Sequence, residues 1–415
     1  MDSRSHRELV DHLFRSEYGR MVAVLTRLFG FEQLELVEDV VQDAFVHALR
    51  SWRTGVPPNP GGWLMQTARN RAIDQLRRGK LHLKFASTVD PGAAAIGMAD
   101  LFHESEISDS QLRLIFACCH PVLDERDQIA VTLQLASGFG VREIARALLT
   151  REETIKKRLQ RSKQRIKEAA VKLEIPAGAQ LKSRVDSVLK VLYLTFNEGY
   201  LASAGDAAIR RDLCAEAMRL TKLVCEHPMS TSSDANALMA LMCYHAARFD
   251  ARLGDNNELI LLADQDRSKW DKELVSVGHV YLARSNPGDN PSAYVLEAAI
   301  AAQHSVAEAY GDTRWDYLLT LYDRLVEVKT TAFVRLNRLV VLAEQRGADV
   351  ALRELASLDA ESFVGNEHLY HSVSARLHEM AGDTEGQRSH LEKALSHAAS
   401  SSERRLIEAR LLSIR

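Results

Sequence analysis

The sequence lacks long apolar runs, an apolar leader and an even set of cysteines. No stretch approaches the roughly 20 apolar residues that a membrane-spanning helix requires. The first residues, Met1 to Asp11, are polar and charged and contain no apolar segment of a secretory signal. The 5 cysteines are an odd number in a long chain, which argues against a disulfide framework and for reduced thiols. We therefore predict a cytoplasmic protein with no membrane association.

Motifs of the common catalytic sites are also absent. The chain has no P-loop, no Gly-x-Ser-x-Gly, no His-Glu-x-x-His and no dinucleotide-binding fingerprint, and its 15 histidines are scattered. The triplet Cys118-Cys119-His120 is a candidate metal ligand set, but adjacent cysteines lack the spacing of a zinc knuckle and no second Cys/His pair is near. We expect these cysteines on the buried side of a helix instead. The sequence thus predicts no catalytic residue, no cofactor and no metal.

What the chain does contain is an uneven distribution of charge. A length of 415 residues, with 46% hydrophobic and 26% charged residues, is that of a soluble globular protein of two or three domains. The net charge is only -3, yet Arg142 to Lys172 holds eleven Arg and Lys residues against four Glu residues. The remainder is therefore net acidic. This asymmetry is expected when one part of a chain meets nucleic acid and another does not.

Helical periodicity runs through almost the whole chain and predicts an all-α fold. In Glu35 to Arg50, one face is apolar, and the other carries Glu38, Asp39, Gln42, Asp43 and His47. Three prolines and three glycines exclude a helix from Arg53 to Gly62, which we predict to be a stiff loop. A basic helix is expected from Trp63 to Arg78.

A linker and a second helical domain are predicted next. Periodicity is lost from Gly79 to Ser108, apart from a short helix expected over 98–102. The second domain is expected to contain helices at 109–119, 124–137, 141–149 and 152–173.

The sharpest local signal lies in Val141 to Arg165. It has the pattern of a helix-turn-helix, with Ile144, Ala145 and Leu148 inward on the first helix and Ile155, Leu159 and Ile166 inward on the second. Thr150 and Glu153 are expected to form a capping box. Leu149 stands in the turn where such units often use glycine. The outward side chains of the second helix are basic or amide, as a helix that reads the major groove requires.

The rest of the chain, from Leu181, is predicted to be a series of helices separated by Gly-containing turns. The last of these turns lie at Gly311, Gly347 and Gly382, at intervals close to the roughly 34 residues of tetratricopeptide (TPR) repeats. A TPR-like array is therefore expected, with an irregular helical bundle as the alternative.

Together these segments resemble the sigma-70 family, specifically its extracytoplasmic-function (ECF) sigma factors. The resemblance rests on the acidic amphipathic helix, the loop, the motif W-L-x-x-x-A-R-N-x-A-I-D-x-L-R-R at Trp63 to Arg78, the linker and the helix-turn-helix, in that order. It implies region 2 over 1–80, a linker over 81–108 and region 4 over 109–176. The 181–415 segment, with LYLTFNEGY at Leu192 to Tyr200 and DRSKWD at Asp266 to Asp271, resembles the TPR-like extension of one ECF subgroup, where it replaces reliance on a separate membrane anti-sigma factor.

The resemblance implies a role for specific residues. The partners are core RNA polymerase, through its β′ and β subunits, and promoter DNA. The docking helix for the β′ coiled coil would present Glu38, Asp39, Gln42 and Asp43. The -10 element would be recognised and melted by Asn59, Trp63, Arg69, Asn70, Arg71, Arg77, Arg78 and Lys80. The -35 element would meet Arg151, Thr154, Lys156, Lys157, Gln160, Arg161, Lys163 and Gln164.

Several alternatives accompany these assignments. The acidic residues of the docking helix have the alternative of a merely solvated face, and Trp63 is more typical of a core aromatic than of a base-stacking one. Asp264 to Asp271 is either the lining of a ligand groove or an interhelical salt-bridge network. We expect the extension to contact the sigma modules or polymerase and to regulate them. The competing function is a stand-alone helix-turn-helix regulator with a peptide-sensing TPR-like domain, which leaves the first 80 residues without a role.

Overall fold

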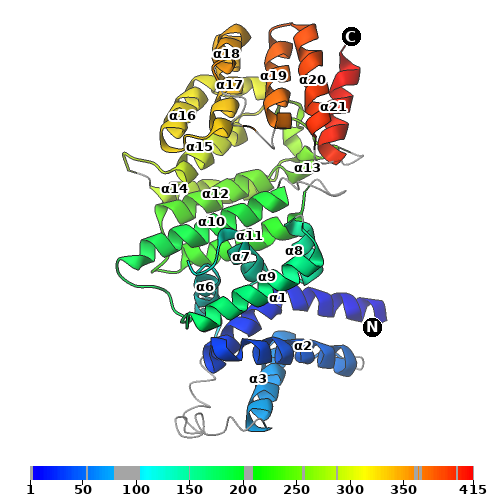
Figure 1. The fold of residues 1–415 in the computed structure, drawn as a ribbon, viewed down its shortest axis with the longest axis vertical. Coiled ribbons are helices and arrows are strands. Elements are labelled where there is room, and N and C mark those ends of the chain that lie inside the picture. The colour runs from blue at the N-terminus through cyan, green and yellow to red at the C-terminus, as the bar shows by residue number, and fades with distance from the viewer. Residues whose placement is uncertain are drawn as a thin grey trace. The chain divides into compact units, whose positions relative to one another are not determined.

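The computed structural model describes residues 3–52, 55–78, 103–148, 150–200, 209–254, 258–286, 288–358, 363, 367–398 and 401–414. Within these ranges the regular structure is helical, apart from an isolated bridge between Leu253 and Leu259 (Figure 1). The predicted all-α fold class is confirmed. The chain divides into two compact units, Met1–Leu194 with Glu226–Ser230, and Thr195–Cys225 with Thr231–Arg415. The described helices all fall short of the length and apolar character that a bilayer-spanning helix needs.

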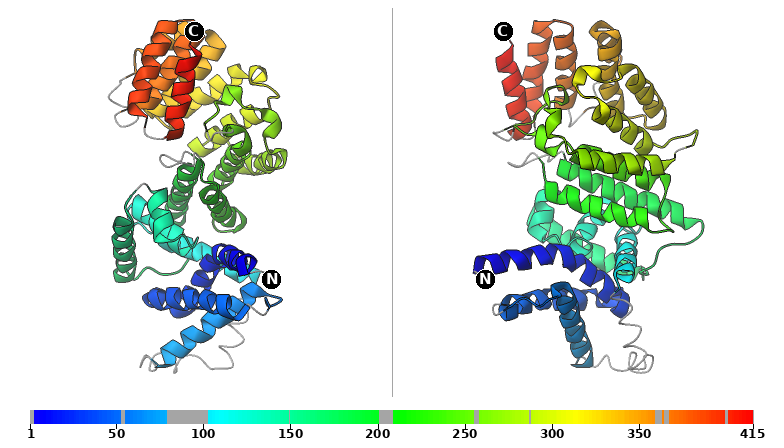
Figure 2. Two further views of the ribbon diagram at one scale, coloured as in Figure 1. Left: turned by 90° about the vertical axis from the view of Figure 1, so that its right-hand side faces the viewer. Right: turned by 180° about the vertical axis from the view of Figure 1, so that it is seen from behind.

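The first unit is organised around the long helix α1 (Ser3–Phe29). After the short 3-10 helix η1 (Phe31–Gln33), α1 packs against α2 (Leu34–Ser51) and α6 (Glu104–Cys118), and α2 packs against α3 (Pro60–Arg78). Figure 2 shows α1 and α2 alongside each other in both views. Met21, Val22 and Leu25 of α1 are completely buried, so the helix forms a core on more than one side. Arg27 links α1 to α6 through Glu106 and Asp109, each at 3.0 Å.

The helix-turn-helix of the first unit is built from three short helices. α7 (Glu125–Leu135) and α8 (Val141–Ala147) both pack on α9 (Glu152–Glu168). The predicted inward residues Ile144, Ala145, Ile155, Leu159 and Ile166 are all buried, which confirms the apolar stripe of both helices. Leu148 is half-buried at the end of α8, and Leu149 lies outside the described residues.

Three predicted helix boundaries were wrong. α3 begins at Pro60 inside the predicted loop, because proline suits the first helical position and the Asn59 side chain accepts a hydrogen bond from the Gly62 amide at 2.9 Å. α6 begins at Glu104, five residues before the predicted start, with Glu104 and Glu106 stabilising its first turn. α9 ends at Glu168 because Ala170 has a positive φ of 47°. The short helix expected over 98–102 lies outside the described residues.

The second unit begins within α10 (Gln180–Tyr200) and continues through α11 (Arg211–Glu226), α12 (Ser233–Ala246) and the short α13 (Phe249–Arg252). Nearly every side chain of α12 is buried, and the helix packs against both α14 (Lys272–Ser285) and α15 (Ala293–Val306). The 3-10 turns η3 (Leu262–Asp264) and η4 (Arg267–Lys269) join α13 to α14, and η5 (Tyr310–Asp312) follows α15.

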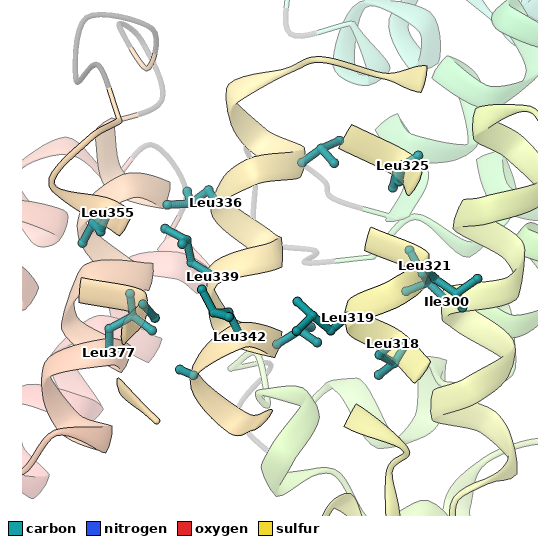
Figure 3. Close-up of a cluster of buried hydrophobic side chains, with 14 of the residues drawn as sticks. Ile300, Leu318, Leu319, Leu321, Leu325, Leu336, Leu339, Leu342, Leu355 and Leu377 are labelled. Carbon is teal, nitrogen blue, oxygen red and sulfur yellow. The ribbon is translucent and has the colours of Figure 1, made fainter. Parts of the chain in front are cut away.

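The C-terminal part of this unit is a series of antiparallel helices. They are α16 (Trp315–Val328), α17 (Ala332–Arg346), α18 (Ala348–Leu355), α19 (Glu367–Met380), α20 (Thr384–His397) and α21 (Ser401–Ser413). A cluster of leucines joins the successive helices, as Figure 3 shows for Leu321 of α16, Leu339 of α17 and Leu377 of α19. Gly347 and Gly382 turn the chain with φ of 91° and 74°, as the two predicted helix-Gly-helix segments require. Whether these pairs form a TPR-like array stays a prediction.

Candidate functional site

The outward face of α2 carries most of the acidic side chains expected there. Asp39, Gln42 and Asp43 are exposed, and Asp43 forms an ion pair with Arg71 of α3 at 2.8 Å. Within the described part of the chain Asp39 has no ion-pair partner. Glu38 differs, because only 8% of the residue is exposed. The expectation that all four lie on one solvated face is therefore wrong for Glu38.

Glu38 is buried because α9 covers it. The Lys163 ammonium lies 2.7 Å from both carboxylate oxygens of Glu38, and the two side chains are only 20% and 10% exposed. Tyr18 of α1 also faces Glu38. The pKa of the Tyr18 hydroxyl is raised, mainly by burial and to a smaller extent by the Glu38 carboxylate. The structure thus joins two residues 125 positions apart that the sequence assigned to different partners.

Of the predicted -10 residues, Asn59 and Trp63 lie at the start of α3, and Arg69, Asn70 and Arg71 lie further along it. Asn59 caps the helix, as described above. Asn70 is exposed and accepts a hydrogen bond from Gln66 at 3.2 Å, and the half-buried Arg69 and Arg71 donate to Gln66 and Asp43. The side chains of Arg77 and Arg78, and all of Lys80, lie outside the described residues.

Trp63 occupies neither a core position nor a free surface. It is half-buried, lies parallel to the His47 ring at a centroid distance of 5.3 Å and contacts the edge of Trp52 at 5.2 Å. The fully packed aromatic of this group is Trp52, of which 4% is exposed. The prediction that Trp63 is a core residue is therefore only half correct.

The recognition helix candidate α9 presents nearly all of its predicted DNA-contacting side chains to solvent. The exposed residues are Arg151, Thr154, Lys156, Lys157, Gln160, Arg161 and Gln164. The predicted capping box at Thr150 is wrong. The N-cap of α9 is Arg151, one residue after Thr150, and the Glu153 side chain pairs with Lys156 at 2.7 Å. This pair lowers the pKa of the Glu153 carboxyl. Half of such a box occurs at α8, where the Glu143 side chain accepts a hydrogen bond from the Gly140 amide at 2.9 Å.

A groove of about 780 Å³ lies between α9 and the start of α2. Its basic wall includes Lys156, Arg161 and Lys163, and its opposite wall includes Glu32 and Glu35. Sequence reasoning missed these two glutamates as partners of the basic helix, although both precede the acidic face of α2. Their position shows that the region around α9 is electrostatically complementary to the region around α2.

The Cys118-Cys119-His120 triplet has no geometry of a metal site. Both thiols are completely buried, and burial raises the pKa of Cys119 to about 12. His120 accepts a hydrogen bond from the Val122 amide at 3.2 Å. Across the described ranges, no three His, Cys, Asp or Glu side chains are grouped to hold a metal ion. The expectation that the cysteines lie on the buried side of a helix is confirmed.

The Leu192–Tyr200 motif of the extension forms the last turns of α10, which continues through Gly199 to Tyr200. Glycine is required there by close packing, since an added Cβ would lie 2.7 Å from the Cys214 sulfur.

The Asp266–Asp271 motif does not form the predicted interhelical salt-bridge network, while the alternative of a ligand groove stays a prediction. Asp266 and Asp271 cap η4 and α14, while Arg267 donates to two backbone carbonyls, so no salt-bridge network joins these described residues.

Known protein families match three segments of the chain. Residues 13–81 match sigma-70 region 2, residues 113–166 match sigma-70 region 4, and residues 184–286 match DUF6596, a family of unknown function. An uncharacterized protein of Rhizobium meliloti (strain 1021) is 32% identical over 387 residues, which cover 92% of this chain and 90% of the relative. No solved structure matches at a significant level.

The two sigma-70 regions correspond to the parts built around α2–α3 and α8–α9. Their order along the chain, and the exposed acidic and basic helices they contain, agree with the sequence resemblance. The chain thus contains region 2 and region 4 of the sigma-70 family, which support a sigma factor's role in promoter recognition, with a helical domain after region 4.

Proposed function

We propose that this protein is an ECF-type sigma factor that binds core RNA polymerase, recognises the -35 element, and recognises and melts the -10 element. The observation that supports it best is the pairing of two complementary surfaces in one chain. Asp39, Gln42 and Asp43 form an exposed acidic face on α2, while α9 carries an exposed basic and amide face. The acidic face suits a basic protein surface on the polymerase, and the basic face suits DNA.

In the proposed reaction this chain supplies binding energy and no catalytic group. α3 and its preceding loop would bind the unpaired -10 strand, with Arg69 and Arg71 neutralising phosphates. The half-buried Trp63 would stack on a base, in the manner of single-strand binding proteins. α9 would enter the major groove at -35.

The test is the formation of a functional holoenzyme. Purified protein is mixed with bacterial core RNA polymerase and passed through a gel-filtration column, and the complex is then assayed for transcription from promoter fragments. We expect co-elution and promoter-dependent RNA synthesis. Failure to bind core polymerase, with retained binding to duplex DNA, would favour the stand-alone regulator.

Removal of basic side chains from α9 is expected to weaken DNA binding in a salt-dependent way. The variants Lys157→Ala and Arg161→Ala each remove an exposed cation, and each lost phosphate contact lowers the slope of log affinity against log salt by about 1. Anisotropy titrations of labelled duplex at several salt concentrations measure this slope. Arg335→Ala, which removes an exposed arginine from α17, is the matched control and should leave the slope unchanged. An unchanged slope in the α9 variants as well would remove α9 from the DNA interface.

The Glu38–Lys163 contact bears on how the two regions act together. The -10 and -35 elements are numbered by their positions in the promoter, so they lie about 25 base pairs apart. At about 3.4 Å per pair this is roughly 85 Å. An arrangement in which α9 touches α2 cannot reach both elements at once. We therefore propose that the two regions separate when the protein engages promoter DNA.

A double-mutant cycle on Glu38→Gln and Lys163→Met measures this contact. Each single change leaves a largely buried charge without its partner and should cost about 2 kcal/mol or more of stability, with a coupling energy of at least ~1 kcal/mol. Urea unfolding of the four proteins gives these values. The exposed Glu153–Lys156 pair has the same 2.7 Å separation and is the matched control, with no measurable coupling expected. Equal coupling in both cycles would argue against a closed state held by Glu38.

The extension is proposed to modulate these steps. The supporting observation is that residues 184–286 match a family of their own, directly after region 4. Transcription by a chain truncated before residue 181 would be compared with that of the full chain. Equal promoter activity would exclude a regulatory role.

A further inference from the structure

The two sequence motifs of the extension converge on a group of arginines in the second unit. The Arg252 guanidinium lies 3.7 Å from the centroid of the Tyr200 ring, and it donates to the Tyr200 carbonyl at 2.8 Å. Trp270 of the second motif is stacked by Arg248 and Arg267, at 5.3 and 4.9 Å from its ring centroid. We call Arg248, Arg252 and Arg267 the arginine cluster.

Within the described residues the arginine cluster makes no direct ion pair with a carboxylate. Arg248 donates to the neutral Gln265 side chain, and Arg267 donates to the carbonyls of His304 and Ala307. Among the described residues, no carboxylate lies within 4.0 Å of any of the three guanidinium groups. Only 9% of Arg252 is exposed, and burial lowers its pKa. A buried cation without an anion is costly, so the site is electrostatically incomplete.

Asp312 attracts the Arg267 charge from beyond direct contact and accepts a hydrogen bond from the Ala309 amide at 3.0 Å, and other nearby acidic residues are engaged elsewhere. Asp266 accepts hydrogen bonds from Ser268, Asp250 pairs with Arg211 at 2.6 Å, and Asp271 caps α14. The carbonyls at the ends of α10 and α15 carry partial negative charge and account for one hydrogen bond of Arg252 and two of Arg267. They do not account for Arg248, which is half-buried and has only an amide oxygen as its acceptor.

Four further polar atoms around the cluster are buried without a partner in the described structure. They are Nδ1 of His245, Nδ1 of His304, Nε1 of Trp270 and Nη2 of Arg267. Burial is the main cause, and the neighbouring arginines the second, of the lowered pKa values of His245, about 3, and His304, about 4. Both rings are therefore neutral at pH 7. Each unsatisfied group costs about 1–3 kcal/mol, which a ligand with acceptor oxygens would recover.

We propose that the arginine cluster, with His245, His304 and Trp270, is the binding site of a small oxyanion, a phosphate or a carboxylate. Guanidinium groups bind both classes through paired N–H donors, and a buried setting strengthens such bonds. The anion would bring α10, α13, η4 and α15 to a common centre. The extension is thereby a ligand-binding domain, and this inference does not depend on the sigma factor role.

The test is thermal unfolding of the full chain with inorganic phosphate and, separately, with citrate. Sodium chloride at matched ionic strength is the reference, and low millimolar concentrations limit the general stabilisation that both anions give any protein. At ten times its Kd, a bound anion should raise the Tm of the extension by about 3 °C. A response to phosphate alone indicates a phosphorylated ligand, and a response to citrate alone indicates a carboxylate.

Variants separate this site from adventitious binding. Arg248→Gln keeps a polar side chain at a half-buried position and should raise the Kd at least tenfold by titration calorimetry; Arg252→Gln is the second variant. Arg219→Gln is the control, because Arg219 pairs with Glu216 at 2.7 Å on α11. The proposal is wrong if neither anion exceeds chloride, or if Arg248→Gln and Arg219→Gln respond alike.

Discussion

Simultaneous charge reversal of Asp39 and Asp43 to lysine is expected to abolish co-elution with core RNA polymerase. Both side chains are exposed on α2, so their replacement leaves the helix core intact. Attraction between opposite charges across the interface becomes repulsion between like charges. The affinity for core RNA polymerase is expected to fall about 100-fold, or by ~2.7 kcal/mol. Gel filtration shows the loss, and a competition assay against a labelled sigma factor measures its size.

The control for this prediction is a reversal of the same kind elsewhere. Glu327→Lys changes an exposed glutamate of α16 in the second unit and should leave polymerase binding unchanged. Reversal of Asp43 also breaks its surface pair with Arg71, but an exposed pair contributes little to stability. Unaltered co-elution of the Asp39/Asp43 variant would show that α2 is not the docking helix.

Acidification from pH 7 to pH 5 is expected to destabilise the second unit by about 4 kcal/mol through His245 and His304, ~2 kcal/mol for each. Burial lowers both folded-state pKa values far below 6.5. Below pH 6.5 the unfolded chain therefore binds more protons than the folded chain, and stability falls with pH until the folded pKa values are reached. The groups that face these rings are Arg248, Arg252 and His304 at His245, and Arg248 and Arg267 at His304.

The measurement is Tm as a function of pH for the natural chain and for a double variant, His245→Gln with His304→Gln. The readout is the slope between pH 7 and pH 5, because the substitutions also change Tm at neutral pH. The natural chain should lose roughly 10 °C more than the variant over this range. His371 and His390 also have lowered pKa values and remain in the variant, so its slope will not be zero. Parallel curves for the two proteins would contradict the prediction.

Helix positions and the two sigma-70 regions could be predicted from the sequence because their signals are local. An apolar stripe with a helical period determines α2 and α9 within a few residues of each, whatever lies further along the chain. Errors occurred where capping chemistry decides, as at Asn59, whose side chain allows α3 to begin at a proline. The need for glycine at position 199 could not be predicted, because a sequence does not show which helix approaches it.

The sequence by itself determined the all-α fold, the order of the two regions and the chemistry of their exposed helices. Only the tertiary structure decided that Glu38 is buried against Lys163 and that three arginines gather around Tyr200 and Trp270. It also decided that His371 and His390 lie 3.1 Å apart between their Nδ1 atoms. Helical periodicity states which side of each helix is apolar. It does not state which helices meet, and burial of a charge depends on the neighbour that the fold brings to it.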